Sequence, residues 1–245
     1  MLLWSQMVVL GCVFFVVSVI FMMFGQGGGA IYVPMLLAFG LPLYKAAATS
    51  QVLIMAATLS AMLVFQKAKM IDWWLTLIVE PPTNLGAFLG GYLSPHFPPM
   101  FSKLCFAAIL LIGAYYMIKP VEEKAHLPTE RRFFTIVRKI GEFEYGLSLP
   151  VIVPLMVMAG FIAGMLGVGG GLFKVPALVL LGGVPMKVAV GTSSLMVGVT
   201  ALTGLFGHAL VGHFDSRLSL ILGVAVFLGA QVGARIGVGV RLFEK

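Results

Sequence analysis

The sequence predicts an all-α polytopic membrane protein with two structural repeats, each of about three to four transmembrane helices and a glycine-interrupted half-helix. Hydrophobic residues make up 60% of its 245 residues and charged residues only 10%. A helix needs roughly 20 apolar residues to cross a bilayer, and several uncharged stretches reach that length: 1–44, 46–66, 145–173 and 188–214. A soluble domain of this size has too small a core to bury so much apolar surface.

The repeats are indicated by a cassette of glycines, a Val-Pro pair and a Thr-Ser pair that occurs twice. The first copy comprises Gly25, Gly27, Gly28, Gly29, Val33-Pro34 and Thr49-Ser50, and the second comprises Gly167, Gly169, Gly170, Gly171, Val175-Pro176 and Thr192-Ser193. Paired helix breaks at matching positions of two halves are typical of transporters whose substrate site lies between the repeats.

Seven full spans are expected, at 2–24, 43–66, 73–94, 99–118, 147–166, 186–211 and 216–238. Two further apolar pieces, 29–41 and 171–183, are too short to cross at about 1.5 Å per residue. Glycines interrupt the helix ahead of each piece, and bare backbone at membrane depth requires surrounding protein or a wet cavity. We therefore expect two half-helices that dip into a shared central cavity.

Three regions follow from this assignment. Residues 1–118 form the first membrane repeat, 119–146 a basic linker, and 147–245 the second membrane repeat, which lacks the last span of the first. An even number of spans per half gives parallel repeats and an odd number gives inverted ones. The sequence leaves this choice open, because either half-helix could also be counted as a crossing.

The linker is the one clearly hydrophilic segment, and the positive-inside rule places it in the cytoplasm. Its basic residues are Lys119, Lys124, Arg131, Arg132, Arg138 and Lys139. Thr129 is a candidate cap for an amphipathic helix on the membrane surface, with apolar residues at helical spacing at Phe133, Ile136, Val137, Ile140 and Phe143. The N-terminus is expected on the same side. We attribute the net charge of +7 to membrane orientation, with no nucleic acid as a partner.

The cassettes have the chemistry of an anion site. Half-helix N-termini offer free amide donors and a partial positive charge, and glycines let a ligand approach the backbone. Hydroxyl and amide side chains near the start of the following spans add neutral donors that can hold an oxyanion and release it. The candidate substrate-binding residues are Gly27, Gly28, Gly29, Thr49, Ser50, Gln51, Gly169, Gly170, Gly171, Lys174, Thr192, Ser193 and Ser194. The competing interpretation of the small residues is close helix packing, which we favour for Gly86 and Gly90.

Two ionisable residues of the predicted membrane segments, Lys174 and Glu80, are candidates for function. Lys174 either attracts the anion or snorkels to the headgroups. Glu80 is a candidate for coupling or gating, or for a partner to a nearby lysine, and Pro81-Pro82 after it should kink or break the helix. The second repeat has Gly223 at the position of Glu80.

The remaining polar residues have structural explanations beside functional ones. Asn84 and Gln231 are candidates for coupling or gating, although a hydrogen bond between helices is the commoner role. Asp72 and Asp215 each precede a span and are interpreted as N-caps. Cys12 and Cys105 are interpreted as small core residues. No metal site and no cofactor are expected.

The duplicated pattern of glycines, Val-Pro, and Ala with Thr-Ser on either side of a basic linker resembles the sulfite exporter family TauE/SafE. The resemblance covers both halves, about four-fifths of the chain. It implies a multi-pass protein of the prokaryotic inner membrane that moves small sulfur-containing anions. It also implies that Gly25 to Gly29 with Thr49-Ser50, and Gly167 to Gly171 with Thr192-Ser193, lie near the substrate. The missing last span and Glu80-Pro81-Pro82 depart from the family pattern.

The expected function is secondary transport, and specifically export, of a small anion such as sulfite or an organosulfonate, by alternating access between the repeats. The expected partners are that anion and the lipid bilayer, and a homo-oligomer is left open. The alternatives are an intramembrane serine hydrolase using Ser193 or Ser194 with His208, and a passive anion channel. The matching Thr49-Ser50 has no histidine nearby, which argues against the hydrolase.

Overall fold

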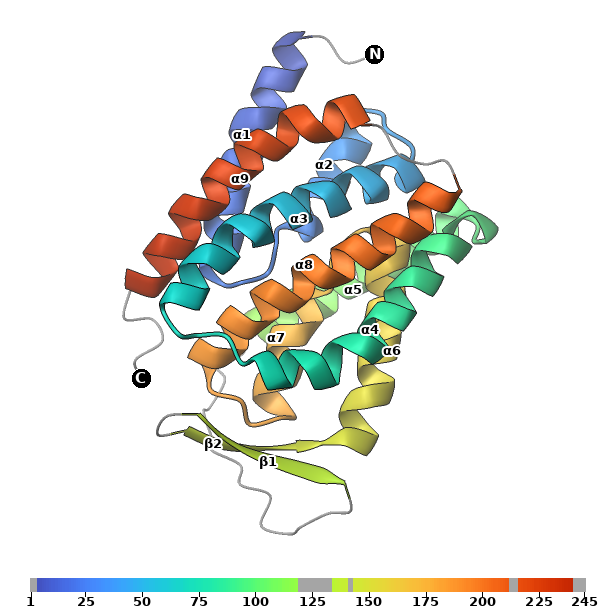
Figure 1. The fold of residues 1–245 in the computed structure, drawn as a ribbon. Helices are drawn as coiled ribbons and strands as arrows, with labels where there is room; N and C mark the ends of the chain where they lie inside the picture. Colours follow the sequence, from blue (N-terminus) through green and yellow to red (C-terminus); the bar gives the residue numbers. More distant parts are fainter. Residues whose placement is uncertain (1–3, 119–133, 141–142, 212–215, 240–245) are drawn as a thin grey trace.

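The computed structural model describes residues 4–118, 134–140, 143–211 and 216–239, and most of these are helical (Figure 1). The predicted all-α polytopic membrane fold is confirmed. The elements are α1 (Trp4–Met23), α2 (Gly29–Ala38), α3 (Leu43–Lys67), α4 (Trp73–Leu93), η1 (Ser94–His96), α5 (Pro99–Ile118), β1 (Thr135–Ile140), β2 (Phe143–Ser148), α6 (Leu149–Leu166), α7 (Gly171–Leu180), α8 (Met186–Leu210) and α9 (Ser216–Gly239).

Most of the predicted spans coincide with these helices to within two or three residues. Among the described residues, four helices are long and apolar enough to cross a membrane, namely α3, α6, α8 and the Leu218–Gly239 part of α9. Helices α1, α4 and α5, of 20, 21 and 20 residues, occupy the other predicted spans. The short helices α2 and α7 have 10 residues each, about 15 Å at 1.5 Å per residue, which is half of the hydrocarbon core.

Local signals in the sequence set the helix ends. Asp72 Oδ1 accepts hydrogen bonds from the N–H groups of Trp74 and Leu75 at 3.0 and 3.2 Å, so Asp72 is the predicted N-cap of α4. Asp215 lies outside the described residues. Gly167 ends α6 in the left-handed conformation with φ of 73°, and its N–H bonds to Ala163 O.

The consecutive prolines of α4 do not end the helix. Pro81 and Pro82 both lie inside α4, which continues to Leu93 and is bent part-way along in Figure 1. A proline removes one hydrogen-bond donor and crowds the preceding turn, which explains a bend.

The two halves contain the same order of helices and lock into each other. In the first half α1 to α4 have 20, 10, 25 and 21 residues, and in the second α6 to α9 have 18, 10, 25 and 24. Helix α4 packs against α6 and α8 of the other half, while α9 packs against α1 and α3. The halves are therefore interdigitated rather than placed side by side.

The contacts also fix the helix directions. Thr192, Thr200 and Thr203 of α8 meet residues at increasing positions of α4, so these helices run parallel. Helices α3 and α8 run antiparallel at the centre, since Gln51 lies beside Gly204 while the later Thr58 lies beside the earlier Gly198. Corresponding helices of the two halves thus run in opposite directions.

Glycines allow this close packing. A Cβ at Gly86 would lie 2.2 Å from Val157 O, and one at Gly90 would lie 1.9 Å from Phe161 O. On the other side, a Cβ at Gly233 would lie 2.2 Å from a carbonyl oxygen of α1. The packing interpretation of Gly86 and Gly90 is confirmed, because backbones at this distance leave no room for any side chain.

The linker differs from its predicted form. Thr129 and Phe133 lie outside the described residues, but the part from Thr135 onward is an antiparallel hairpin of β1 and β2 and not an amphipathic helix. The spacing of Ile136, Val137 and Ile140 fits a helix, yet the first strand pairs with the second from Thr135↔Ser148 to Ile140↔Phe143. Tyr145 and Leu147 of the second strand are both buried, and residues two positions apart lie on the same face of a strand.

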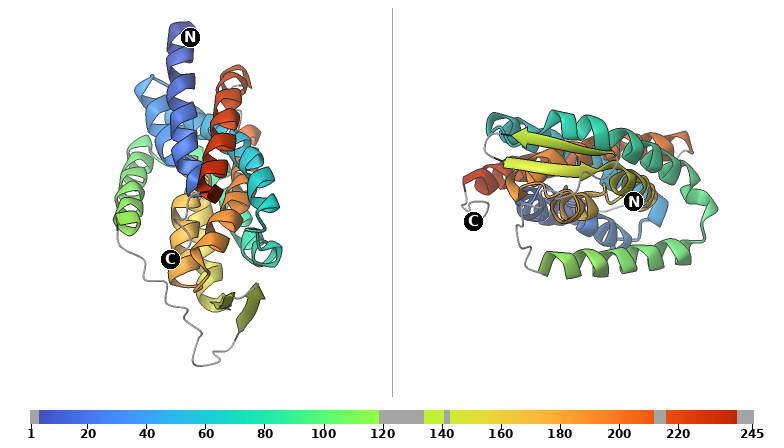
Figure 2. Two further views of the ribbon diagram at one scale, coloured as in Figure 1. Left: turned by 90° about the vertical axis from the view of Figure 1, so that its left-hand side faces the viewer. Right: turned by 90° about the horizontal axis from the view of Figure 1, so that it is seen from below.

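The expected side of the N-terminus is also wrong. Helix α1 begins at the end of the molecule opposite to the hairpin (Figures 1 and 2). The half-helix α2 runs back toward the end where α1 begins, and α3, α4 and α5 then run lengthwise in turn. The count of spans from the sequence assumed that the chain stays at the far end of the molecule after α1, whereas α2 brings it back toward the end where α1 begins.

Candidate functional site

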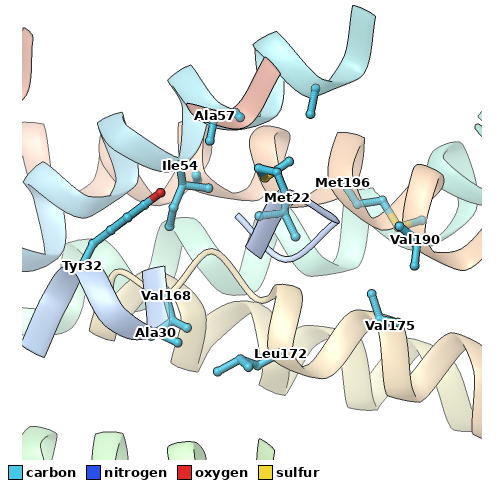
Figure 3. Close-up of a cluster of buried hydrophobic side chains, with 14 of the residues drawn as sticks. Met22, Ala30, Tyr32, Ile54, Ala57, Val168, Leu172, Val175, Val190 and Met196 are labelled. Atoms are coloured by element: carbon cyan, nitrogen blue, oxygen red, sulfur yellow. The ribbon is translucent and has the colours of Figure 1, made fainter. Parts of the chain in front are cut away.

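The two glycine loops, which precede α2 and α7, meet at the centre of the protein. A Cβ at Gly29 would lie 2.7 Å from Val168 O of the second loop, and one at Gly171 would lie 2.4 Å from Gln26 O of the first. Each loop therefore touches the backbone of the other. Figure 3 shows Ala30 and Val168, which flank this contact, in one apolar cluster with residues of α3 and α8.

The loops pack against one apolar pair from the central helices. Cβ atoms at Gly27 and Gly169 would each lie within 3.1 Å of side-chain carbons of both Ile54 and Val197. Both glycines have positive φ, 80° and 73°, a conformation that only glycine adopts without strain. The shared cavity expected here is closed in this structure, because the loops and this apolar pair fill the space.

The half-helices start as the sequence predicts. The first backbone hydrogen bonds of α2 are donated by Ile31 and Tyr32 to Gly28 O, and those of α7 by Phe173 and Lys174 to Gly170 O. The earlier amides of each helix have no acceptor among the described residues, as is general for a first turn. Two sets of free donors thus lie next to the loop contact.

The polar residues at the start of α3 are buried in the same region. Ser50 Oγ donates to Gly167 O at 2.7 Å, and Gln51 Nε2 donates to Gly164 O at 3.0 Å. Thr49 Oγ1 and Gln51 Oε1 have no hydrogen-bond partner among the described residues. The first-half donors therefore reach across to the second glycine loop and keep spare polar atoms.

The matching residues of α8 are equally buried. Thr192 Oγ1 accepts a hydrogen bond from the N–H of Asp72 at 2.9 Å. The hydroxyls of Ser193 and Ser194 have no partner among the described residues, although both residues are fully buried. Buried polar groups are nearly always hydrogen-bonded, so these hydroxyls are suited to a ligand or to another conformation of the protein.

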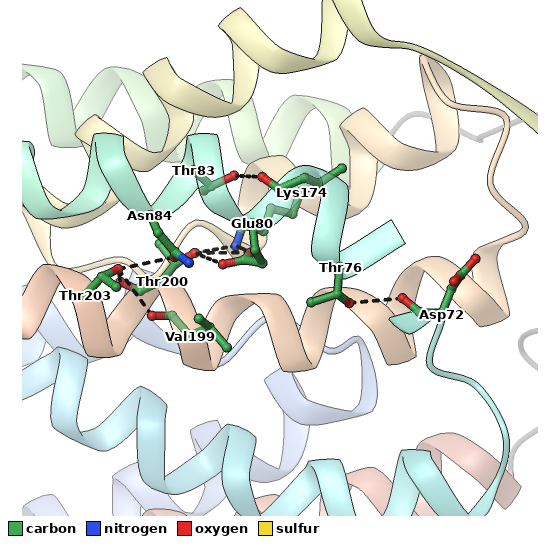
Figure 4. A network of polar contacts seen from close by, with 10 residues as sticks. Asp72, Thr76, Glu80, Thr83, Asn84, Lys174, Val199, Thr200 and Thr203 are labelled. Carbon is green, nitrogen blue, oxygen red and sulfur yellow. Dashed lines mark hydrogen bonds and ion pairs between the residues drawn. The ribbon is translucent and has the colours of Figure 1, made fainter. Parts of the chain in front are cut away.

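Glu80 and Lys174 lie together in one cluster with Thr200 (Figure 4). Lys174 Nζ lies 2.5 Å from Glu80 Oε1 and 2.5 Å from Thr200 Oγ1, and Thr200 Oγ1 donates to Glu80 Oε2 at 3.1 Å. Lys174 is fully buried, so it does not snorkel to the headgroups. The interpretation of Glu80 as a partner to a lysine is confirmed, and the lysine is Lys174.

Asn84 and Gln231 join helices of the two halves. Thr203 Oγ1 lies 3.3 Å from Asn84 Oδ1, and Ser60 Oγ lies 2.9 Å from the Gln231 side-chain amide. Each amide thus makes the hydrogen bond between helices that we named as the commoner role. Thr200 was missed as a site residue, although Thr200 and Thr203 on α8 match the helical spacing of Glu80 and Asn84 on α4.

The geometry does not assemble the serine hydrolase. Ser194 and His208 lie on the same helix, 14 positions apart in the sequence, and so about 21 Å apart at 1.5 Å per residue. His208 Nε2 lies 2.9 Å from Gly164 O, and its Nδ1 lies 3.3 Å from Ser94 Oγ. The described residues contain no group of three metal-ligating side chains either.

The hairpin is fastened to the N-cap of α4, a contact that the sequence did not reveal. The Tyr145 hydroxyl donates to Asp72 Oδ2, and Arg138 lies 3.2 Å from Asp72 Oδ1 and over the ring of Trp74. Burial, reinforced by the hydrogen bond to Asp72, raises the pKa of Tyr145 above its ordinary value. Since the N–H of Asp72 bonds to Thr192, this contact connects the hairpin with the second Thr-Ser pair.

The family is decided by comparison with known proteins. A family model described as sulfite exporter TauE/SafE matches residues 10–243. The chain belongs to the TauE/SafE family. "Probable membrane transporter protein YunE" of Bacillus subtilis is 31% identical over 225 residues, which are 86% of this chain and 81% of the relative.

Two further relatives of this TauE/SafE protein are also called probable membrane transporter proteins. One, from Haemophilus influenzae, is 29% identical over 93% of this chain and 84% of its own length. The other, from Methanocaldococcus jannaschii, is 24% identical over 91% of this chain and 83% of its own. No solved structure gives a significant match. The protein is a multi-pass membrane transporter.

Proposed function

We propose that this TauE/SafE protein is a secondary transporter that exports a small oxidised sulfur anion, such as sulfite or an organosulfonate. Its membrane would be the inner membrane of a prokaryotic cell, with the linker 119–146 in the cytoplasm. The anion would bind between the two halves, and the motive force would be an ion or substrate gradient. The family description supplies the substrate class.

The observation that carries this proposal is the meeting of the two glycine loops. Gly29 and Gly171 bring the free first-turn amides of two oppositely directed half-helices to the same place. Both helix N-termini carry partial positive charge and suit an anion. The unpartnered hydroxyls of Thr49, Ser193 and Ser194 lie at the start of the adjoining helices and add neutral donors.

The closed packing of these loops suits alternating access. A site that opens to one side at a time has to pass through a conformation in which neither side is open. Helices α3 and α8 run antiparallel and pack against each other and against both loops, so a small rocking of one half can open either end. We assign the described structure to this closed conformation.

The test is a thermal-shift screen of the purified protein against sulfite, sulfate, thiosulfate, sulfoacetate and taurine. A ligand that binds the native state raises the apparent melting temperature in proportion to occupancy. We expect at least one sulfur oxyanion to do so. A shift with organosulfonates alone would remove sulfite as the substrate and leave the transporter, whereas no shift with any anion would contradict the proposal.

Reconstituted vesicles separate a transporter from a channel. Preloaded unlabelled anion should speed the entry of labelled anion, and the flux should saturate with concentration. Flux that neither saturates nor shows counterflow would assign the protein as a channel. In a transporter, Ser193→Ala combined with Ser194→Ala should reduce the affinity for the anion only partially, whereas a hydrolase would lose its turnover almost completely.

A further inference from the structure

The Glu80–Lys174 pair joins the two halves at the edge of the second glycine loop. Glu80 belongs to α4 of the first half and Lys174 to the first turn of α7 in the second. Their side chains are 5% and 0% exposed. A Cβ at Gly170 would lie 3.6 Å from Lys174 Cε, so the lysine side chain runs beside the loop.

The Glu80 carboxylate occupies what is chemically an anion site. It receives the Thr200 hydroxyl at 3.1 Å and the Lys174 ammonium at 2.5 Å, from a side chain in the first turn of α7. An ammonium and a hydroxyl are also groups that hold sulfonate or sulfite oxygens. In this conformation the protein's own carboxylate fills the place that an external anion would take (Figure 4).

No other charged group faces the pair within the described residues. Helix α6 contains no acidic or basic residue, and Lys174 is the one charged residue of α7. Helix α5, which also contacts α7, carries Lys103, which is exposed. On α4 the nearest is Asp72, eight positions before Glu80, and on α8 the nearest ionisable group is His208, eight positions after Thr200. Eight positions along a helix are about 12 Å, so the charge balance here depends on Glu80 and Lys174 alone.

The first half carries no second pair. The positions that match Lys174, Glu80 and Thr200 hold Tyr32, Gly223 and Ala57. Among the described residues, this buried ion pair between α4 and α7 therefore has no counterpart at the matching positions of the repeat.

We propose that the substrate anion displaces Glu80 from Lys174 and that Glu80 takes up one proton from water as it leaves. This proposal rests on the proposed function. Before binding, the site holds one ammonium and one carboxylate. Afterwards it holds the ammonium, a monovalent anion and a neutral carboxylic acid, so it stays neutral in both states. An unpaired charge at this depth would be costly. Binding of the anion therefore requires that Glu80 takes up a proton at the same time.

This coupling constrains the direction of transport. One proton accompanies each monovalent anion, so the movement is electroneutral. An inward proton gradient then favours uptake, and net export requires a sufficient outward gradient of the anion itself.

The first test uses the wild-type protein and needs no variant. Purified protein in weakly buffered detergent solution, containing a pH-indicating dye, is mixed with isethionate, sulfoacetate or sulfite. Isethionate carries a single sulfonate charge near neutral pH, so any proton taken up with it belongs to the protein; sulfoacetate and sulfite each have a second ionisable group and serve to detect binding. We expect about one proton per bound monovalent anion, by linkage. Binding without proton uptake overturns the inference and leaves the proposed function intact, whereas no binding of any anion overturns both.

The second test removes the charge of each partner in turn. Glu80→Gln keeps the shape and leaves Lys174 unoccupied, so we expect about tenfold tighter anion binding and no proton uptake, since the competitor is gone. Lys174→Met should lose anion binding. Lys45→Gln, which changes an exposed lysine at the start of α3, is the matched control and should behave as wild type.

These results distinguish an exchange site from a structural salt bridge. If Glu80→Gln binds the anion with unchanged affinity and still takes up a proton, the pair is structural and the inference is wrong. If Glu80→Gln does not fold, the wild-type proton count decides alone.

Discussion

The replacement of Lys174 by Met tests how much the buried ion pair contributes to stability. Met is similar to Lys in length but has no charge, so the change leaves the Glu80 carboxylate without its partner. Glu80 is 5% exposed on its side chain and keeps the Thr200 hydroxyl, at 3.1 Å, and the Asn84 side-chain amide as hydrogen-bond donors. Neutral donors do not balance a buried charge.

The expected loss follows from this burial. Removal of one partner of a buried salt bridge destabilises proteins by about 3–5 kcal/mol. For a chain of this size 1 kcal/mol corresponds to roughly 2–4 °C, so the melting temperature should fall by about 6–20 °C. Glu80→Gln together with Lys174→Met removes both charges and should lie within about 1.5 kcal/mol of wild type, since neutral replacements of buried pairs are often tolerated.

The assay is thermal unfolding in one detergent, followed by intrinsic tryptophan fluorescence, for the wild type, the two single variants and the double variant. Lys45→Met serves as the exposed control, with an expected change of less than about 0.5 kcal/mol. A double variant as unstable as Lys174→Met would show that the lost packing of the lysine side chain, and not the unpaired charge, causes the effect. That result would refute the reasoning.

Three further predictions concern packing, the site and the hairpin. Gly90→Ala should destabilise the protein by about 1–3 kcal/mol, because the added Cβ would lie 1.9 Å from a carbonyl oxygen of α6. The control is Gly223→Ala, whose Cβ would have its nearest neighbour at 3.9 Å. In the same thermal unfolding assay this control should be neutral or stabilising. Ser50→Ala should lower stability by about 1 kcal/mol because it removes a buried hydrogen bond. The hydroxyl of Ser193 has no partner among the described residues, so Ser193→Ala should leave stability unchanged and lower anion affinity. Equal losses of melting temperature in the two variants would contradict this. Burial raises the pKa of Tyr145, so its stabilisation of the hairpin contact is complete below the ordinary tyrosine pKa of about 10 and is lost only as the pH rises above that value. In an alkaline titration, the tyrosinate absorbance that disappears in Tyr145→Phe should therefore develop above pH about 10; an ordinary tyrosine midpoint would contradict this.

The sequence predicted the helical segments well because each of them is a local property. An apolar run of suitable length, a glycine at a break and an aspartate at a cap all act within a few residues. Asp72 caps α4, and the half-helices begin at Gly29 and Gly171, as the pattern indicated. The repeat was visible for the same reason, since the two copies resemble each other residue by residue.

The linker shows where local reasoning failed. Ile136, Val137 and Ile140 are compatible with both a helix and a strand, and one strand cannot be recognised without its partner. The pairing of Arg138 with Tyr145 brings both side chains to Asp72, which lies in a different part of the chain. That contact stabilises the hairpin, and no pattern within the linker predicts it.

The sequence by itself thus determined the membrane class, the places of the helices and breaks, and the duplication, and it named candidate residues for an anion site. The tertiary structure alone decided that the halves interlock in opposite directions, that the glycine loops close on each other, and that Lys174 is held by Glu80. The physical reason is separation along the chain: these contacts join residues about a hundred positions apart, and they form only when three or more helices pack at once. Composition and periodicity describe one helix at a time, whereas a buried charge pair is a property of the helices around it.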